Sequence, residues 1–342
     1  MNENRRVIVA ERPRYIVPTV NCFRLETAPM PDCGPGQLRI RTLCLSMDAQ
    51  LYAKLQRISP DAEPIRLYEA MTGPALGRVE ASLHPDFSPG ELVSGFWAWQ
   101  DYVVSNGRRL RKLDFSLQRS THALSAYGAS AFGAYIALQK LAPAEWGETV
   151  VVGTALGGLG NIASQIAKAK GCRVVGITGS EEKCQRGMTA LGLDDCVSYN
   201  APDFADRVRT ACRKGVDVFV DTSGGKVLEA VVPLLQRKAR IAACGLMATP
   251  HFGEPAFRGR FQNTMSFMFE VINRRITVQG LVIFDHLRQS LRDFHRDMNA
   301  WIDSGKIRPM EDIVSGLEQA PRAFQDIFEG RNVGKRLVWI SD

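Results

Sequence analysis

The spacing of hydrophobic residues changes twice between residues 148 and 184, in the order strand, helix, strand. Residues 149–152 form a short β-branched apolar run, which is typical of a buried strand in a parallel sheet. Apolar residues then recur at helical spacing over 161–170, and Gly171 stands where a C-terminal cap is expected. Residues 172–177 predict a second strand. The segment is therefore predicted to be a βαβ unit whose helix opens with a glycine turn.

The N-terminal third of the chain has a different pattern. Residues 1–125 lack the alternation of strand and helix, and proline and glycine turns such as 33–36 and 88–90 interrupt them. Short strands are expected at 5–10, 37–45, 77–81, 92–97 and 101–104. This region is predicted to be a β-rich domain, either barrel-like or partly open.

Strands and helices alternate from residue 148 to about 282. Besides the βαβ unit, the expected elements are strands at 216–221, 239–244 and 276–284, and helices at 128–141, 227–235 and 287–304. A last strand at 334–340 is expected to return to the first domain. The predicted fold class is α/β, with a doubly wound parallel sheet in 126–314 and a β domain in 1–125 that 315–342 completes.

The glycine turn has the pattern Ala155-x-Gly157-x-x-Gly160, in which Ala155 replaces the first glycine of GxGxxG. Gly157 would let the backbone approach a pyrophosphate, and Gly160 would let helix and strand pack closely. The free N–H groups at the start of the helix would then face the phosphates. The alternative is a glycine turn in an α/β domain that binds no nucleotide. The strand, helix and second strand around this turn favour a dinucleotide site.

The end of the second predicted strand bears on the choice of dinucleotide. NAD-binding folds place an acidic residue there, which accepts hydrogen bonds from the adenosine ribose. Here residues 176–180 contain no acidic residue, and Lys183 follows. A small polar turn with a nearby lysine would attract a 2′-phosphate, so we predict NADP(H) as the cofactor. The alternative is that Lys183 is an ordinary solvated lysine, since Glu181 and Glu182 precede it.

Composition narrows the class of protein. The chain has 342 residues, 45% hydrophobic and 23% charged, as expected for a globular protein of two domains. No apolar run approaches the roughly 20 residues that span a bilayer, and the charged N-terminus has no signal-peptide core. The eight cysteines form no CxxC pair, which favours reduced thiols in the cytoplasm over disulfides or a zinc site.

The net charge of +7 includes basic clusters at 108–112 and 237–240. No nucleic-acid-binding motif accompanies them, so solvated faces are the default interpretation and no nucleic-acid or membrane partner is expected. Attraction of a phosphorylated or carrier-bound acidic substrate is the weaker alternative.

Several segments spread over nearly the whole chain resemble one family. They are LGRVEASLHPDF at 76–87, GFWAWQDY at 95–102, the βαβ unit, Cys-Gly at 244–245, VQGLVIFD at 278–285 and GRNVGK at 330–335. With them the chain resembles the zinc-independent branch of the medium-chain dehydrogenase/reductase superfamily, the leukotriene B4 dehydrogenase/prostaglandin reductase-like enone reductases. The resemblance implies a GroES-like β domain beside a Rossmann domain, usually in a homodimer. It also implies transfer of hydride from NADPH to the β-carbon of an α,β-unsaturated carbonyl compound, followed by protonation of the α-carbon.

The same resemblance implies which residues contact the cofactor. The pyrophosphate would lie on Gly157, Gly158, Leu159 and Gly160, and the adenosine and 2′-phosphate would meet Thr178, Gly179, Lys183 and Tyr199. The remaining cofactor contacts would be Thr222, Cys244, Gly245, Leu281, Val282, Ile283 and Asn332. For Tyr199 the alternative is that residues 196–199 are simply a short packed strand.

Three segments depart from the family pattern near the substrate. The family often has Asp-Pro-Tyr-Met-Arg where 48–52 is DAQLY, and Met-Pro-Gly-x-Thr-Ala-Tyr where 129–135 is ASAFGAY. It commonly has a tyrosine where 250–251 is Pro-His. Two phenols of the substrate pocket are thus missing, which implies a specialised substrate. Tyr52 and Gln50 are the predicted catalytic residues, acting as electrostatic helpers with a ribose hydroxyl of the cofactor, while solvent could protonate the α-carbon.

The zinc ligands of the related alcohol dehydrogenases are not matched. The corresponding positions are Leu45, Gly73 and Pro74, and Cys44 is one residue out of register, so no metal is predicted. Phe132, Trp97 and Phe284 are candidate pocket walls, although core packing is the more common role of an aromatic residue. A quinone oxidoreductase on the same fold and a non-catalytic NADPH-binding sensor remain as alternative functions.

Overall fold

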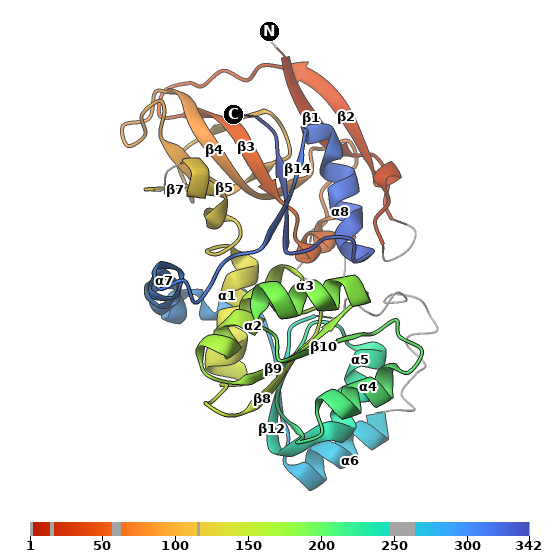
Figure 1. Ribbon diagram of the computed structural model, residues 1–342. Helices are drawn as coiled ribbons and strands as arrows, with labels where there is room; N and C mark the ends of the chain where they lie inside the picture. Colours follow the sequence, from red (N-terminus) through yellow and green to blue (C-terminus); the bar gives the residue numbers. More distant parts are fainter. Residues whose placement is uncertain (1–2, 14–16, 57–62, 115–116, 246–263, 342) are drawn as a thin grey trace. The chain divides into compact units, whose positions relative to one another are not determined.

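The structure is a computed structural model that describes residues 3–13, 17–56, 63–114, 117–245 and 264–341. The chain divides into two compact units, and no sheet formed by these residues is shared between them (Figure 1). Unit 1 consists of Met1–Gly128 and Glu311–Asp342, and unit 2 consists of Ala129–Met310. No helix in the described ranges has the length and apolar composition needed to cross a membrane.

Unit 1 is rich in strands, as the sequence predicts for its N-terminal part, and all of its strand pairs are antiparallel except β14 (Glu311–Ser315) with β15 (Lys335–Trp339). Strands β1 (Glu3–Val9) and β2 (Phe23–Pro29) form a two-stranded sheet. A seven-stranded sheet has the order β14-β15-β3-β4-β5-β7, and β6 pairs with β3. Its strands are β3 (Leu38–Ser46), β4 (Thr72–Ser82), β5 (Leu92–Ala98), β6 (Tyr102–Ser105), β7 (Arg111–Lys112), β14 (Glu311–Ser315) and β15 (Lys335–Trp339).

The C-terminal strand returns to the first sheet, as predicted. β15 pairs antiparallel with β3, with Leu337 opposite Ser46, and Figure 1 shows the blue end of the chain beside the orange strands. The sequence pattern does not predict β2, β7 or β14. Residues of β2 and β14 are mostly exposed or half-buried, so these strands lack the apolar run by which a strand is recognised.

Three aromatic rings form the centre of the core of unit 1. Trp99 is fully buried, and its ring centroid lies 5.8 Å from Phe23 and 5.7 Å from Phe324. Phe324 belongs to α8 (Ala320–Phe328), a helix whose apolar face carries Ala323 and Phe324 into the core. The C-terminal helix is thereby fixed against Trp99 and against Phe23 of β2, both of which lie far earlier in the chain.

Unit 2 is a six-stranded parallel sheet in the order β10-β9-β8-β11-β12-β13. Its strands are β8 (Thr149–Val152), β9 (Arg173–Thr178), β10 (Asp195–Ser198), β11 (Val216–Asp221), β12 (Leu235–Ala243) and β13 (Thr277–Gly280). The helices are α1 (Ala129–Ile136), α2 (Gly158–Ala169), α3 (Glu181–Leu191), α4 (Phe204–Ala211), α5 (Gly225–Val231), α6 (Thr264–Arg274) and α7 (Leu287–Asp303). The predicted βαβ unit is β8, α2 and β9, and its strands pair side by side.

Two predicted elements of unit 2 have different bounds. The strand expected at 276–284 ends at Gly280, and Ile283–His286 forms a 3-10 turn. The predicted helix at 227–235 is α5 followed by a 3-10 turn at Val232–Leu234, and β12 begins directly after it at Leu235. Apolar residues continue through both junctions, so hydrophobicity alone does not locate the change of backbone conformation.

The predicted linking helix is α1, which continues as a π-helical turn over Ala137–Leu141. Phe132 and Tyr135 both pack on Phe294 of α7, with ring centroids 5.2 and 5.5 Å apart. The Tyr135 hydroxyl donates a hydrogen bond to Asp297 Oδ2 at 2.7 Å. Phe132 is therefore a core residue of unit 2, the alternative that the sequence analysis gives for it.

A buried ion pair connects β15 to the segment that carries Gln50 and Tyr52. Lys335 Nζ contacts Asp48 Oδ1 and donates to the Met47 carbonyl at 2.9 Å, and Ser46 Oγ donates to Asp48 Oδ2 at 2.6 Å. Only 4% of the Lys335 side chain and 6% of the Asp48 side chain are exposed. Because both charges are removed from water, each depends on the other for compensation.

Replacing Lys335 by methionine is therefore expected to destabilise the protein strongly. Lys335→Met leaves the Asp48 carboxylate buried without its cation, and breaking such a pair costs about 3–5 kcal/mol in the free energy of unfolding. Urea denaturation followed by tryptophan fluorescence measures this loss. The double variant Asp48→Asn/Lys335→Met removes both charges and should be more stable than Lys335→Met alone.

The matched control is Lys112→Met, which breaks the exposed pair with Glu91 at 2.8 Å. Its expected cost is below about 1 kcal/mol, because exposed pairs contribute little. Equal effects of Lys335→Met and Lys112→Met would show that the buried pair does not stabilise unit 1.

Candidate functional site

The strands β8, β9, β11 and β12 end at one edge of the parallel sheet in unit 2, and the glycine turn lies at this edge. A Cβ atom on Gly160 would come within 2.2 Å of the Thr154 carbonyl oxygen, and one on Gly157 within 3.1 Å of the same atom. The Gly157 N–H donates to that oxygen at 2.7 Å. Glycine at position 160 is thus required for α2 to pack against the turn, as the sequence analysis expects.

The turns after β8 and β11 are joined through Thr222. Its hydroxyl lies 2.6 Å from the Thr154 hydroxyl and donates to the Gly153 carbonyl at 2.7 Å. Thr154 has a φ of +42°, a strained conformation for a residue other than glycine. Gly245, after β12, is close as well, since a Cβ there would lie 3.3 Å from the Thr222 carbonyl oxygen. The structure therefore brings predicted contacts from three strand ends together.

Asp221 organises the turn after β11, a role that the sequence analysis misses. Its Oδ1 accepts hydrogen bonds from the N–H groups of Ser223 at 2.9 Å and Gly224 at 2.8 Å. Burial raises the pKa of its carboxyl. The Ser223 hydroxyl is buried and has no hydrogen-bond partner among the described residues. An unpaired buried hydroxyl beside a glycine turn fits a ligand that is rich in hydrogen-bonding groups, as a dinucleotide is.

Cys244 follows β12 and is held as a thiol. Burial raises its pKa to about 12, and Sγ donates to the Ala242 carbonyl at 3.5 Å. A thiol with so high a pKa is not a nucleophile at neutral pH. Cys244 can therefore form part of a binding surface without supplying covalent chemistry.

A second group of predicted residues gathers where β9 and β10 end. A Cβ on Gly179 would lie 3.0 Å from the Tyr199 hydroxyl oxygen, so this glycine leaves space for the phenol. Ser180 caps α3, and its Oγ accepts the Lys183 N–H at 3.2 Å. Thr178 Oγ1 donates to the Ser180 carbonyl at 3.1 Å. Gly179, Lys183 and Tyr199 thus belong to one small region, and Tyr199 follows β10 instead of lying in it.

Two further residues join this region without having been predicted. Asn200 Nδ2 donates to the Gly179 carbonyl at 2.8 Å. Lys226, in α5, places its Nζ 5.2 Å from the centroid of the Tyr199 ring. The strand order separates β10 from β11 by two strands, so spacing in the sequence does not indicate that Lys226 and Tyr199 meet.

Three predicted apolar contacts surround Gly133 in α1. A Cβ at position 133 would lie 3.2 Å from Leu281 Cδ2, 3.3 Å from Leu159 Cδ1 and 3.5 Å from Ile283 Cγ2. Val282, between them in the chain, is 54% exposed. Leu159, Leu281 and Ile283 are therefore assembled by the structure, around a helix glycine that the sequence analysis does not identify.

The predicted catalytic residues lie in unit 1 on a 3-10 helix, Ala49–Lys54. Gln50 is exposed, and Tyr52 is half-buried with its ring centroid 5.9 Å from that of Phe328. Burial raises the pKa of the Tyr52 phenol above its ordinary value of 10.0, so the hydroxyl stays protonated at neutral pH. Asn332, the predicted cofactor contact from unit 1, is buried and donates through Nδ2 to the Gly334 carbonyl at 2.8 Å.

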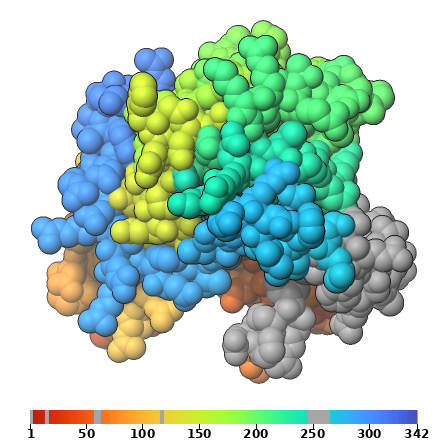
Figure 2. All heavy atoms as spheres, turned by 90° about the horizontal axis from the view of Figure 1, so that it is seen from below, coloured from red at the N-terminus to blue at the C-terminus, as the bar shows by residue number. Residues whose placement is uncertain are grey.

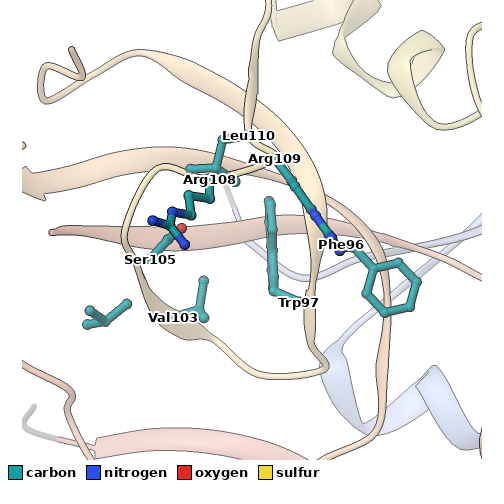
Figure 3. A pocket seen from close by; sticks show the side chains of 8 residues that line it. Phe96, Trp97, Val103, Ser105, Arg108, Arg109 and Leu110 are labelled. Carbon is teal, nitrogen blue, oxygen red and sulfur yellow. The ribbon is translucent and has the colours of Figure 1, made fainter. Parts of the chain in front are cut away.

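Unit 1 also contains a pocket of about 250 Å³ (Figure 3). Trp97 forms one wall, with its indole N–H donating to Thr42 Oγ1 at 3.1 Å. Phe96 also lines the pocket and is 53% exposed. Arg108 and Arg109 line the same pocket, and neither guanidinium forms an ion pair with a described residue. Trp97 is thus the one candidate wall that lines this pocket.

No three His, Cys, Asp or Glu side chains in the described part of the chain cluster so that they could hold a metal ion. The positions matched to zinc ligands lie in β3 and β4, where Leu45 and Cys44 are fully buried. Burial raises the pKa of the Cys44 thiol strongly, which disfavours the thiolate that a metal requires. Phe284 is 71% exposed, while Pro250 and His251 lie outside the described residues.

Two family models match the chain in agreement with its division into units. A model described as the N-terminal domain of oxidoreductase matches residues 5–113, and one described as zinc-binding dehydrogenase matches residues 158–300.

Curated and solved relatives match the chain over almost its entire length. It is 37% identical to the NADPH-dependent curcumin reductase of Escherichia coli (strain K12), over 99% of this chain and 97% of that protein. It is 30% identical to prostaglandin reductase 1 of Rattus norvegicus, over 94% of each. The crystal structure of CurA from Vibrio vulnificus in complex with NADPH has 36% identity and a TM-score of 0.92, and covers 99% of both chains.

Two of these relatives cover 99% of the chain, so they leave no large part of it unmatched. The α/β fold with a parallel sheet and a separate β-rich unit is confirmed by the solved structures. The chain therefore belongs to the zinc-independent branch of the medium-chain dehydrogenase/reductase superfamily, the branch that contains the NADPH-dependent enone reductases.

Proposed function

We propose that this protein reduces the carbon–carbon double bond of an α,β-unsaturated carbonyl compound with NADPH. Hydride goes to the β-carbon and a proton to the α-carbon. The observation that carries this proposal is 37% identity along 99% of the chain to an NADPH-dependent curcumin reductase. A relative named (+)-pulegone reductase, 29% identical over 91% of the chain, and prostaglandin reductase 1 add support.

The residues of unit 2 are proposed to bind the cofactor. NADPH supplies the hydride when it is bound, and the protein orients it. Gly157, Gly158, Leu159 and Gly160 would hold the pyrophosphate at the start of α2, where backbone N–H groups are free. The further contacts proposed are Thr178, Gly179, Lys183, Tyr199, Thr222, Cys244, Gly245, Leu281, Val282, Ile283 and, from unit 1, Asn332.

Tyr52 and Gln50 are proposed to stabilise the negative charge that develops on the substrate oxygen. A raised pKa keeps the Tyr52 phenol a hydrogen-bond donor throughout the neutral range. A donor that is already in place favours the charged transition state over the neutral ground state. The absence of two family phenols, from 48–52 and from 250–251, supports a specialised substrate.

The finer aspects of organisation are also proposals. We infer that unit 1 corresponds to the GroES-like domain and unit 2 to the Rossmann domain, near the predicted boundaries at 125 and 315. A cytoplasmic location stays a prediction. So does a carrier-bound acyl substrate, for which Arg108 and Arg109 offer positive charge in unit 1.

The proposed reaction is tested by following NADPH oxidation by absorbance. The panel contains enones, enals, quinones and acyl thioesters, with NADH in parallel. We expect turnover of enones with NADPH well above NADH, because a positively charged site favours the 2′-phosphate. Product analysis by mass spectrometry should show the addition of two hydrogens across the double bond.

Two outcomes would support the alternatives. Faster turnover of quinones than of any enone would indicate a quinone oxidoreductase. NADPH binding without turnover anywhere in the panel would indicate a sensor, a function that the missing phenols also allow. Either result would contradict the enone reductase proposal.

Tyr52→Phe is expected to lower kcat/KM for an enone by about 10- to 100-fold, the range of about 1.5–3 kcal/mol for a hydrogen bond to a charged group. The dissociation constant for NADPH should not change. The neutral phenol is the donor and its pKa is raised, so in the wild type its deprotonation should reduce the rate only above pH 10.

Tyr68→Phe is the matched control, because Tyr68 is 61% exposed in the same unit. It should retain wild-type kcat/KM. If Tyr52→Phe has the same kcat/KM as this control, Tyr52 is not a catalytic residue.

A homodimer that pairs two copies of β13 is proposed as the assembly. β13 is the last strand in the order of its sheet, all four of its residues are exposed, and no described strand pairs with its outer edge. α6, which ends at Arg274 shortly before β13 begins, has the exposed apolar side chains Phe269 and Ile272. The cyan part of the surface in Figure 2 contains α6. An open edge with apolar neighbours is suited to pairing with another chain.

Val278→Lys is therefore expected to shift the protein from dimer to monomer, because lysine blocks pairing at an exposed edge. Sedimentation equilibrium measures the change. Leu83→Lys, which places a lysine at a position that is 58% exposed in unit 1, is the control and should remain dimeric. A wild-type monomer, or a dimer that survives Val278→Lys, would contradict this interface.

A further inference from the structure

Lys226 is the starting point of a further inference about how the cofactor is chosen. It is the second residue of α5 and is exposed, and its Nζ lies 5.2 Å from the centroid of the Tyr199 ring. A cation in this position is attracted to the face of the ring, which restricts where the ammonium group lies. No acidic side chain in the described ranges forms an ion pair with Lys226.

The turn before α5 directs this lysine. Gly224 and Gly225 have φ values of +66° and +50°, a left-handed conformation that glycine adopts without strain. The Asp221 carboxylate fixes the turn through the N–H groups of Ser223 and Gly224. The turn thus positions the backbone of Lys226, and the Tyr199 ring attracts its ammonium group.

The contact between Lys226 and Tyr199 crosses the edge of the sheet where the predicted adenosine site lies. Tyr199 follows β10 and Lys226 follows β11, while β9 and β8 lie between them in the sheet. β9 ends beside Gly179, whose missing side chain leaves space for the Tyr199 hydroxyl. The ammonium group of Lys226 therefore lies over the ring of Tyr199, whose hydroxyl is next to Gly179.

We propose that Lys226 is a second cationic determinant of NADPH specificity, which acts with Lys183 on the 2′-phosphate while the Tyr199 ring holds it in place. This inference rests on the proposed use of NADPH. A phosphate monoester carries up to two negative charges, so two lysines can each form a charge-assisted interaction with it. NADH lacks this phosphate and would gain nothing from either lysine.

The test uses the full-length protein and two fragments, 2′,5′-ADP and 5′-AMP, which differ in the 2′-phosphate alone. Isothermal titration calorimetry measures their dissociation constants without any turnover. Lys226→Met keeps the aliphatic part of the side chain over Tyr199 and removes the charge. This substitution is expected to weaken the binding of 2′,5′-ADP by about tenfold, the lower end of the range for a hydrogen bond to a charged group. The affinity for 5′-AMP should not change.

Two further variants separate this role from packing and from general surface charge. Lys226→Arg retains the cation and should bind 2′,5′-ADP within about threefold of wild type, because arginine also pairs with phosphate and stacks on aromatic rings. Lys214→Met removes one exposed positive charge elsewhere in unit 2 and should change neither affinity. The loss in Lys226→Met should shrink as salt is raised from about 0.05 to 0.5 M.

The outcomes that overturn the inference are distinct from failure of the proposed function. If wild type prefers 2′,5′-ADP to 5′-AMP but Lys226→Met binds both as wild type does, Lys226 is not a determinant and the NADPH proposal stands. Equal losses for both fragments would show that Lys226 contacts the shared adenosine, and would also overturn the inference. If wild type does not prefer 2′,5′-ADP, both the inference and the use of NADPH fail.

Discussion

The arrangement of unit 2 depends on a backbone contact that only glycine permits. A Cβ at position 160 would lie 2.2 Å from the Thr154 carbonyl oxygen, far inside contact distance. The first turn of α2 can therefore approach the end of β8 closely, and its free N–H groups face the edge where the other strands end. Any larger residue would force the helix away from the sheet and would separate the contacts that Thr222 makes with Thr154 and Gly153.

Unit 1 depends on a different kind of constraint, a pair of charges kept from water. Asp48 precedes the 3-10 helix that carries Gln50 and Tyr52, and Lys335 begins the last strand. Their contact joins the 3-10 helix at Ala49–Lys54 to β15, although Asp48 and Lys335 are 287 residues apart in the chain. Burial makes the pair costly to break but does not by itself make it stabilising. Its value is in fixing one position for the segment that carries the predicted hydrogen-bond donor.

Regular patterns made much of this organisation predictable from the sequence. The β-branched run of β8, the helical spacing of α2 and the glycine between them identify a βαβ unit because each follows a local rule. The same rules fail where polarity is mixed, as in β2 and β14, or where apolar residues continue through a change of conformation, as after Gly280. Side-chain contacts were harder still to predict. Nothing in the spacing of residues shows that Lys226 reaches Tyr199, because that contact depends on the order of strands in the sheet.

The distribution of acidic residues at the sheet edge connects the fold to the choice of cofactor. β9 ends at Thr178 and Gly179 follows it, without the carboxylate that would repel a 2′-phosphate. At the same edge of the sheet β11 ends in a carboxylate, Asp221, but this group is buried and accepts hydrogen bonds from two backbone N–H groups. The turn that Asp221 stabilises is the one that presents Lys226. The buried carboxylate of Asp221 thus helps to position the exposed ammonium group of Lys226. This edge of the sheet retains positive charge, which favours the binding of a phosphate.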